Sequence, residues 1–320
     1  MASSRASHLP RGTVPCVADR TTHGDGGTRG ISGTVDLGGP VHHVDYGGRE
    51  DGPVVVLVHG LGGSHLNWDL LAPLLTPYAR VHALDLPGFG LSEPGRRLTG
   101  VRDNVAVLDR FVREVAGAPA VLVGNSMGGM ISVLEAARSP AKVSGLVLVD
   151  PALPGPRGRP DPRVAANFAL YAVPGVGERR IAQRRAQLGA RGTVLETMRL
   201  CGVDPDRLPP ELVDRSVALV DQRQDVSGMD RAFLTATRSL LLLLADPRLL
   251  RRALAGVDVP VLLLHGDRDR LVPVSVARDL ARRYPAWRYE ELPGVGHVPQ
   301  LEVPERVAEL ILDWLPAIRR

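Results

Sequence analysis

Short apolar runs that alternate with longer amphipathic segments restrict most strongly how this chain can fold. Six runs have the composition of strands buried on both faces, namely Val54–His59, Val81–Asp85, Ala120–Gly124, Gly145–Asp150, Val259–Gly266 and Trp287–Leu292. Helix-patterned segments are His65–Leu75, Val101–Val115, Met127–Ala137, Val274–Arg283 and Pro304–Leu315. A predicted hairpin around Gly38-Gly39, with strands Thr34–Leu37 and Val41–Tyr46, precedes them. The alternation predicts an α/β fold with a mostly parallel eight-stranded sheet flanked by helices.

One long stretch interrupts this alternation. Residues 153–246 carry no strand pattern; they begin with the stiff segment "PGPRGRPDP" and continue as several helix-like segments. We therefore expect residues 31–152 and 247–320 to form an α/β core and residues 153–246 to form an all-helical cap. Residues 1–30 are rich in Ser, Arg, Thr and Gly, which predicts a disordered N-terminal extension.

The composition narrows the classes of partner. An apolar fraction of 44% is enough for a full hydrophobic core, and the net charge is only +4. No basic block is interleaved with aromatic residues, which argues against nucleic-acid binding. No apolar run approaches the roughly 18 residues needed to span a membrane. We expect a small-molecule substrate rather than a nucleic acid or a membrane, and the oligomeric state stays open.

The two cysteines bear on the compartment. Cys16 and Cys201 lie far apart and match neither a disulfide framework nor a metal site, so a reducing compartment is expected. The N-terminal residues also lack the apolar stretch of a signal peptide. The sequence thus predicts a cytoplasmic protein.

The segment "VLVGNSMGGM" places a serine, Ser126, between glycines directly after a predicted strand. Such a segment is typical of a tight turn, of a phosphate-binding loop, or of the G-x-S-x-G nucleophile elbow. The other glycine-rich segments, "HGLGGS" and "PGFGLS", do not match the dinucleotide fingerprint, and no Walker lysine is present. His42 and His43 lack partner ligands at metal spacing. We therefore expect no cofactor and no metal.

Polar residues follow the predicted strands at the edge where ligands bind in open parallel sheets. Ser126 follows one strand, Asp150 the next, Asp267 and Asp269 the penultimate one, and His297 the last. A serine, a carboxylate and a histidine thus converge in the chain order Ser…Asp…His, which is the order expected of an α/β-hydrolase.

With these motifs, residues 32–318 resemble the α/β-hydrolase fold superfamily, in particular serine hydrolases with a helical cap. The resemblance implies that Ser126 is the nucleophile, that His297 is the general base, and that the backbone N–H groups of Leu61 and Met127 form the oxyanion hole. Asp269 matches the acid in the family's G-x-x-D loop, while Asp150 and Asp267 remain alternatives. His59 is expected to support the Leu61 loop.

The resemblance leaves the substrate open. A serine nucleophile argues against haloalkane dehalogenase and epoxide hydrolase chemistry, which use an aspartate at that position. Hydrolysis of a small to medium, mostly apolar carboxylic ester, thioester or lactone fits best. A C–C bond hydrolase is the runner-up, although "GHVPQLE" departs from that pattern at Val298 and Leu301, and a small-molecule receptor is the alternative of another class. The candidate substrate-binding residues are Gly60, Gly62, Asn125, Phe168, Tyr171, Phe233 and Val298.

Overall fold

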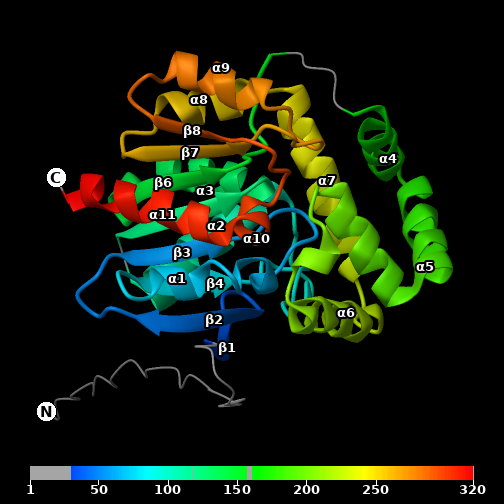
Figure 1. Cartoon of the computed structure of the whole chain (residues 1–320). Coiled ribbons are helices and arrows are strands. Elements are labelled where there is room, and N and C mark those ends of the chain that lie inside the picture. The colour runs from blue at the N-terminus through cyan, green and yellow to red at the C-terminus, as the bar shows by residue number, and fades with distance from the viewer. Residues whose placement is uncertain (1–29, 118, 157–160, 320) are drawn as a thin grey trace, which may run out of the picture.

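The structure, a computed structural model, describes residues 30–117, 119–156 and 161–319. Its centre is an eight-stranded sheet with the order β1-β2-β4-β3-β5-β6-β7-β8 (Figure 1). Strands β1 (Ile31–Asp36) and β2 (Pro40–Gly48) form an antiparallel hairpin, and β2 also pairs antiparallel with β4. All other pairs of neighbouring strands are parallel. The predicted α/β fold with a mostly parallel sheet is confirmed.

The remaining strands lie within two residues of their predicted positions. They are β3 (Val54–Val58), β4 (Arg80–Leu84), β5 (Ala120–Asn125), β6 (Val143–Val149), β7 (Val261–Gly266) and β8 (Arg288–Leu292). Every residue of β5 and β7 is buried, because helices cover both faces of the sheet. This double cover is why the strands read as continuous apolar runs in the sequence.

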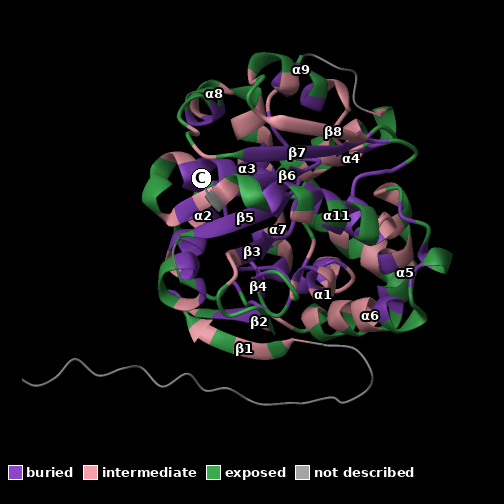
Figure 2. Cartoon of the chain, turned by 60° about the vertical axis from the view of Figure 1, so that its left-hand side comes forward, coloured by how far each residue is buried: buried purple, intermediate pink, exposed green. Residues whose placement is uncertain are grey.

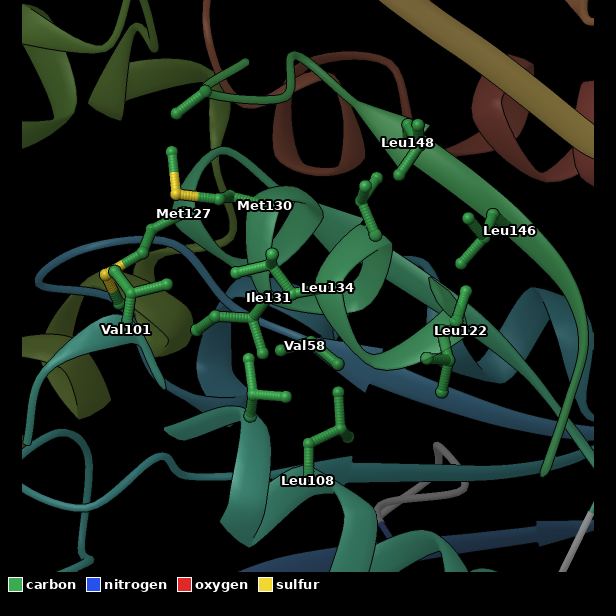
Figure 3. Packing of buried hydrophobic residues seen from close by; sticks show 14 of the residues in the cluster. Val58, Val101, Leu108, Leu122, Met127, Met130, Ile131, Leu134, Leu146 and Leu148 are labelled. Carbon is green, nitrogen blue, oxygen red and sulfur yellow. The ribbon is translucent and has the colours of Figure 1, made fainter. Parts of the chain in front are cut away.

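Each face of the sheet has its own hydrophobic core. Side chains alternate along a strand, so Val56 and Val58 of β3 enter one core while Val55 and Leu57 enter the other. The first core, part of which Figure 3 shows, is closed by α2 (Val101–Phe111), α3 (Met127–Arg138), α8 (Arg248–Ala255) and α9 (Ser275–Arg283). The second is closed by α1 (Ala72–Leu75) and α11 (Pro304–Trp314). Both cores hold the strand ends in fixed positions.

The predicted helix over His65–Leu75 is wrong as a single element. The structure has a short 3-10 helix, η1 (His65–Trp68), and then the single turn α1. Ser64 caps η1 by accepting a hydrogen bond from Leu66 N. Pro73 lies in the first turn of α1, where a missing N–H costs nothing, so a new helix begins there instead of continuing η1.

Four helices follow β6 and lie together beyond one end of the sheet (Figure 1). They are α4 (Pro162–Ala172), α5 (Val176–Leu200), α6 (Pro210–Gln224) and α7 (Met229–Ala245), and we refer to residues 162–245 as the helical cap. Within the described part of residues 153–246 there is no strand. Figure 2 shows buried strands at the sheet centre and many exposed residues on α5 and α6. The boundaries of the cap as a domain stay a prediction, and the extension predicted at residues 1–30 lies outside the described residues apart from Gly30.

The cap is tied to the core by hydrogen bonds near the start of α2. The Ser239 hydroxyl on α7 accepts a hydrogen bond from Val101 N at 3.0 Å, and the Thr99 hydroxyl donates to Ala232 O at 3.1 Å. Cap helix α7 therefore satisfies one of the free N–H groups at the N-terminus of α2. Among the described helices, none is both long and apolar enough to cross a membrane.

Candidate functional site

Ser126 occupies the sharp turn between β5 and α3 in a strained conformation. Its φ of 54° is positive, which is uncommon for a residue other than glycine. Its N–H donates to Val149 O at 3.0 Å, and its carbonyl accepts from Ala152 N at 3.0 Å. A Cβ at Gly128 would lie 2.1 Å from Val58 O, and one at Gly124 would lie 2.5 Å from Gly128 O. The glycines thus let the strand and the helix approach closely enough to hold the serine in this turn.

The loop after β3 lies against this serine. A Cβ at Gly60 would be 3.0 Å from Ser126 Cβ, and Gly62 has a φ of 77°. Neither Leu61 N–H nor Met127 N–H donates a hydrogen bond to another described residue, and Met127 is the first residue of α3. Two free backbone donors therefore belong to segments that meet at Ser126.

His59 supports this loop through hydrogen bonds of both ring nitrogens. Its Nδ1 lies 2.8 Å from Gly60 O, and its Nε2 accepts a hydrogen bond from Leu86 N at 3.0 Å. Complete burial lowers the pKa of His59 to about 4, so the ring is neutral at neutral pH. These contacts fit the supporting role that was expected from the sequence.

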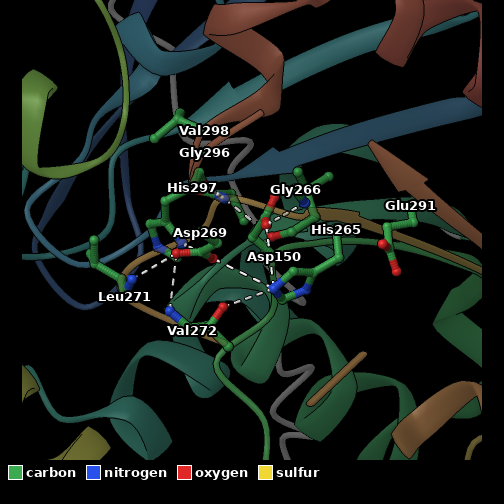
Figure 4. Close-up of polar contacts among 12 residues, drawn as sticks. Asp150, His265, Gly266, Asp269, Leu271, Val272, Glu291, Gly296, His297 and Val298 are labelled. Atoms are coloured by element: carbon green, nitrogen blue, oxygen red, sulfur yellow. Dashed lines mark hydrogen bonds and ion pairs between the residues drawn. The ribbon is translucent and has the colours of Figure 1, made fainter. Parts of the chain in front are cut away.

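His297 and Asp269 come together from the loops after β8 and β7 (Figure 4). His297 Nδ1 lies 2.6 Å from Asp269 Oδ2, and Asp269 Oδ1 accepts from Leu271 N at 2.7 Å and from Val272 N at 3.0 Å. Burial acts to raise the pKa of Asp269, but the charge and hydrogen bond of His297 outweigh burial and lower it. Asp269 is thus an ionised acceptor that fixes the imidazole with Nδ1 toward it and leaves Nε2 for another partner.

The elbow and the histidine loop are joined through Asn125. Its side-chain Nδ2 donates to His297 O and to Val149 O, each at 3.1 Å. Among the described hydrogen bonds, none joins the Ser126 hydroxyl to His297; in structures without ligand such contacts are often long. Asn125 therefore holds the two loops together, and its predicted part in binding substrate stays a prediction.

The three candidate acids differ in what they contact. Asp267, directly after β7, accepts from Gly294 N at 2.7 Å with its Oδ1 and so supports the turn after β8. Asp150 is fully buried behind Asp269, where its Oδ1 accepts from Gly266 N at 2.9 Å. Of the three carboxylates only Asp269 is hydrogen-bonded to His297. The contacts therefore favour Asp269 as the partner of the histidine.

Aromatic side chains of the cap reach the Leu61 loop. The rings of Phe168 and Tyr171 on α4 are 6.5 Å apart, and those of Tyr171 and Phe233 are 5.6 Å apart, both edge to face. Phe233 Cε2 lies 3.5 Å from the position of a Cβ at Gly62. Three of the predicted pocket residues thus form a chain that ends at the loop beside Ser126.

Val298 lies in different surroundings. It is buried in a small apolar cluster between core and cap, with Leu66 of η1 and Leu212 of α6. Its packing explains its burial without a ligand. Its predicted contact with substrate remains a prediction.

A second cluster of histidines and a carboxylate was missed by the sequence analysis. Asp85 Oδ2 lies 2.8 Å from His42 Nδ1 and 2.9 Å from His65 Nδ1, and the three groups are close enough to hold a metal ion. The expectation that His42 lacks partners was therefore wrong. Asp85 also accepts hydrogen bonds from the backbone N–H groups of His65 and Leu91. Since N–H donors already occupy the carboxylate, we interpret this cluster as a hydrogen-bond network.

Comparisons with known proteins identify related sequences and structures of the same fold. The pimeloyl-[acyl-carrier protein] methyl ester esterase of Photobacterium profundum is 28% identical over 273 residues, which cover 82% of this chain and 95% of that protein. The crystal structure of a membrane phospholipase A is 27% identical with a TM-score of 0.69, covering 92% of this chain and 88% of that one. Haloalkane dehalogenase DbeA from Bradyrhizobium elkani shares the fold, with a TM-score of 0.73 at 24% identity over 90% of this chain and 98% of its own. A sequence model of the alpha/beta hydrolase family matches residues 55–310, and the chain belongs to that family.

Proposed function

We propose that the chain is a serine esterase that cleaves a small to medium, mostly apolar carboxylic ester through an acyl-enzyme intermediate. The observation that carries the proposal is the strained Ser126, which lies between the Leu61 loop and the N-terminus of α3. His297, oriented by Asp269, lies on a loop that Asn125 ties to the same turn. This is the arrangement that nucleophilic acyl transfer requires.

In the first half of the reaction the Ser126 hydroxyl attacks the ester carbonyl, and His297 Nε2 takes the hydroxyl proton. Asp269 stabilises the imidazolium that results, because it is already ionised and hydrogen-bonded to Nδ1. The N–H groups of Leu61 and Met127 receive the negative oxygen, and losing one such donor typically costs about 10²–10³ in rate. The positive end of α3 adds to this stabilisation.

The second half releases the acid. His297 gives its proton to the departing alcohol, which leaves the acyl group on Ser126. A water molecule then attacks the acyl carbonyl while His297 takes its proton, and the same two N–H groups again hold the negative oxygen. As this intermediate collapses, His297 gives the proton to the Ser126 oxygen, the acyl carbon–oxygen bond to the serine breaks, and the carboxylic acid is released.

The relatives and the residue at position 126 support an ester over other substrates. The Photobacterium relative is named for methyl ester hydrolysis. A dehalogenase needs a carboxylate as the nucleophile, and this chain has a serine there. The edge-to-face chain of Phe168, Tyr171 and Phe233 offers an apolar wall for an acyl group.

Hydrolysis of a series of p-nitrophenyl esters, from acetate to long acyl chains, tests the proposal. We expect the wild type to release nitrophenol at a rate that depends on chain length, and the Ser126→Ala variant to release almost none. Turnover that is absent from the wild type, or that is unchanged in the variant, would contradict the proposal. It would direct attention to C–C bond substrates and to a receptor role.

The place of action is also a proposal. Burial raises the pKa of the free Cys201 thiol to about 12, so this thiol stays protonated and is poorly suited to disulfide exchange. The wide spacing of the two cysteines in the sequence, which fits no disulfide framework, favours the reducing interior of the cell.

A further inference from the structure

A second carboxyl, Asp150, lies directly behind the pair formed by Asp269 and His297. Asp150 directly follows β6 and has a φ of 45°, and it shares a positive φ only with Ser126 among the described residues other than glycine. Its N–H donates to Leu264 O at 3.0 Å and its Oδ1 accepts from Gly266 N at 2.9 Å. Conformations of this kind cost about 1–3 kcal/mol and persist where the surrounding structure enforces them.

The two carboxyls are too close for both to be charged. Polar atoms of Asp150, Asp269 and His297 all lie within 4.8 Å of one another, and all three residues are buried. When two buried carboxyls lie this close, the charge of one raises the pKa of the other, which favours a proton on one of them. Asp269 already accepts from His297 and from two backbone N–H groups, whereas Asp150 Oδ2 is buried without a hydrogen-bond partner. The proton therefore belongs on Asp150.

The other titratable groups around the pair agree with this assignment. His265 Nε2 lies 3.5 Å from Asp150 Oδ1 and 3.6 Å from Asp269 Oδ2, but it bonds to Val272 O at 2.9 Å, and burial lowers its pKa. Glu302 accepts from Gly296 N, and burial raises its pKa. For Asp150 itself, burial and then the negative charge of Asp269 raise the pKa well above its usual value. Neither His265 nor Glu302 supplies a charge that would ionise Asp150.

We propose that Asp150 is a positioning residue whose protonated carboxyl donates a hydrogen bond to Asp269, and that it is a second acid able to orient His297 when Asp269 is neutralised. The proposal rests on the proposed esterase function. Asp150 would hold Asp269, and through it the imidazole, in one orientation. With Asp269 replaced by a neutral residue, the repulsion disappears and Asp150 becomes free to ionise within reach of His297.

The protonation state can be measured without any substrate. In protein labelled with carbon-13 at the aspartate carboxyls, we expect one buried carboxyl to keep the NMR shift of a protonated acid at neutral pH. That signal should persist in Ser126→Ala and disappear in Asp150→Asn. If Asp150 instead titrates in the ordinary aspartate range, the proposal is wrong whether or not the chain is an esterase.

A cycle of activity measurements tests the second part. On p-nitrophenyl esters we expect Asp150→Asn, whose amide can still donate to Asp269, to stay within about fivefold of the wild type, and Asp150→Ala to lose more. Asp269→Asn should lose less than the roughly 10⁴-fold typical of a triad acid, and the double variant Asp150→Asn/Asp269→Asn should lose at least about tenfold more. Equal activity of Asp269→Asn and the double variant would show that Asp150 does not act as a second acid for His297.

Two controls keep the outcomes distinct. Circular dichroism and thermal melting of each variant separate lost catalysis from lost folding. Ser126→Ala, measured in parallel, tests the proposed function alone, because turnover that survives in this variant contradicts the esterase proposal. The carbon-13 measurement still decides whether Asp150 is protonated in that case. A pH profile of Asp269→Asn should also show an acid limb that moves, since a different carboxyl must then ionise.

Discussion

Among the residues that the structure describes, two clusters bring together a serine, a histidine and a buried aspartate, and one of them has the surroundings of a catalytic site. In the first, Ser32 Oγ lies 2.5 Å from His42 Nε2, and His42 Nδ1 lies 2.8 Å from Asp85 Oδ2. In the second, His297 Nδ1 lies 2.6 Å from Asp269, while Ser126 makes no hydrogen bond to the ring. Judged by contacts alone, the first cluster is the more complete triad.

The difference lies in the serine and its neighbours. Ser32 lies on β1, an extended strand at the edge of the sheet, and no helix begins there. Ser126 has a positive φ, directly precedes α3 as its N-cap residue and touches a loop with a free N–H. A tetrahedral intermediate needs such donors, so the backbone around the serine separates catalysis from a hydrogen-bond network.

The Asp85 cluster has a structural task that its contacts explain. Asp85 Oδ1 accepts from His65 N at 2.6 Å and Oδ2 from Leu91 N at 2.8 Å, while the Ser92 hydroxyl donates to Asp85 O at 2.7 Å. His42 and His65 complete the ring of donors. The carboxylate thus fixes η1 and the turn after β4 against the hairpin.

The sharpest test of this comparison replaces each serine. Ser126→Ala should lower kcat/KM for p-nitrophenyl esters by about 10⁴-fold or more, because the nucleophile is gone. Ser32→Ala should leave the rate within about threefold, since it removes one hydrogen bond on an edge strand at which no helix begins. Labelling with a fluorophosphonate probe checks both, and a phosphonate adduct on Ser32 would show that the first cluster is reactive after all.

The carboxylate of the first cluster should matter for stability rather than rate. Asp85→Asn replaces one carboxylate oxygen, which is surrounded by N–H donors, with an NH2 group that cannot accept their hydrogen bonds. We expect a loss of about 2–4 kcal/mol in the free energy of unfolding. Urea unfolding measures this loss, and kcat of the folded variant should equal that of the wild type. Asp246→Asn, in an exposed ion pair with Arg248, is the control and should leave stability almost unchanged, because solvent screens the pair. A stable Asp85→Asn variant with lost activity would reverse the roles of the two clusters.

A matched pair of glycines extends the test to the backbone. Gly90 and Gly62 both have positive φ, but a Cβ at Gly90 would lie 2.0 Å from the Asp85 carboxyl carbon, while one at Gly62 would only meet Phe233 at 3.5 Å. Gly90→Ala should therefore cost about 3–4 kcal/mol of stability. Gly62→Ala should cost about 1 kcal/mol but lower kcat about tenfold, because strain in the loop moves the Leu61 N–H. Melting curves of the two variants measure the stability losses, and ester kinetics measure kcat. Equal stability losses in Gly90→Ala and Gly62→Ala would contradict the prediction that the Asp85 carboxyl leaves no room for a side chain at position 90.

Much of the fold could be predicted because its signals are local. Buried strands read as apolar runs, and the elbow around Ser126 needs glycines at fixed offsets, so both are visible in a few neighbouring residues. The pairing of His297 with Asp269 was predicted from a resemblance, and the structure places the two side chains in contact.

What the sequence could not reveal depends on distant contacts. His42 and Asp85 are separated by 43 positions, and nothing near either residue indicates the other. The break between η1 and α1 follows from Ser64 and Pro73, whose effects compete with an apolar pattern that favours one long helix. The position of Asp150 at a strand end was visible, but its burial against Asp269 required the register of β6 and β7.

The smallest predicted effect is a pH dependence of the stability that His65 contributes within the Asp85 cluster. Burial acts to lower the pKa of His65, but the charge and hydrogen bond of Asp85 outweigh burial and raise it above its ordinary value of 6.5. A histidine whose pKa is raised by folding contributes stability that is fully present below 6.5 and is lost as the pH rises through the folded pKa. The stability difference between wild type and His65→Gln should therefore be larger at about pH 5.5 than at about pH 9. At both pH values this difference should be smaller than the stability loss caused by Asp85→Asn. Urea unfolding at the two pH values measures it. A difference that grows toward high pH would mean that His65 is neutral in the folded protein, and the Asp85 cluster would then be held by neutral hydrogen bonds rather than by an ion pair.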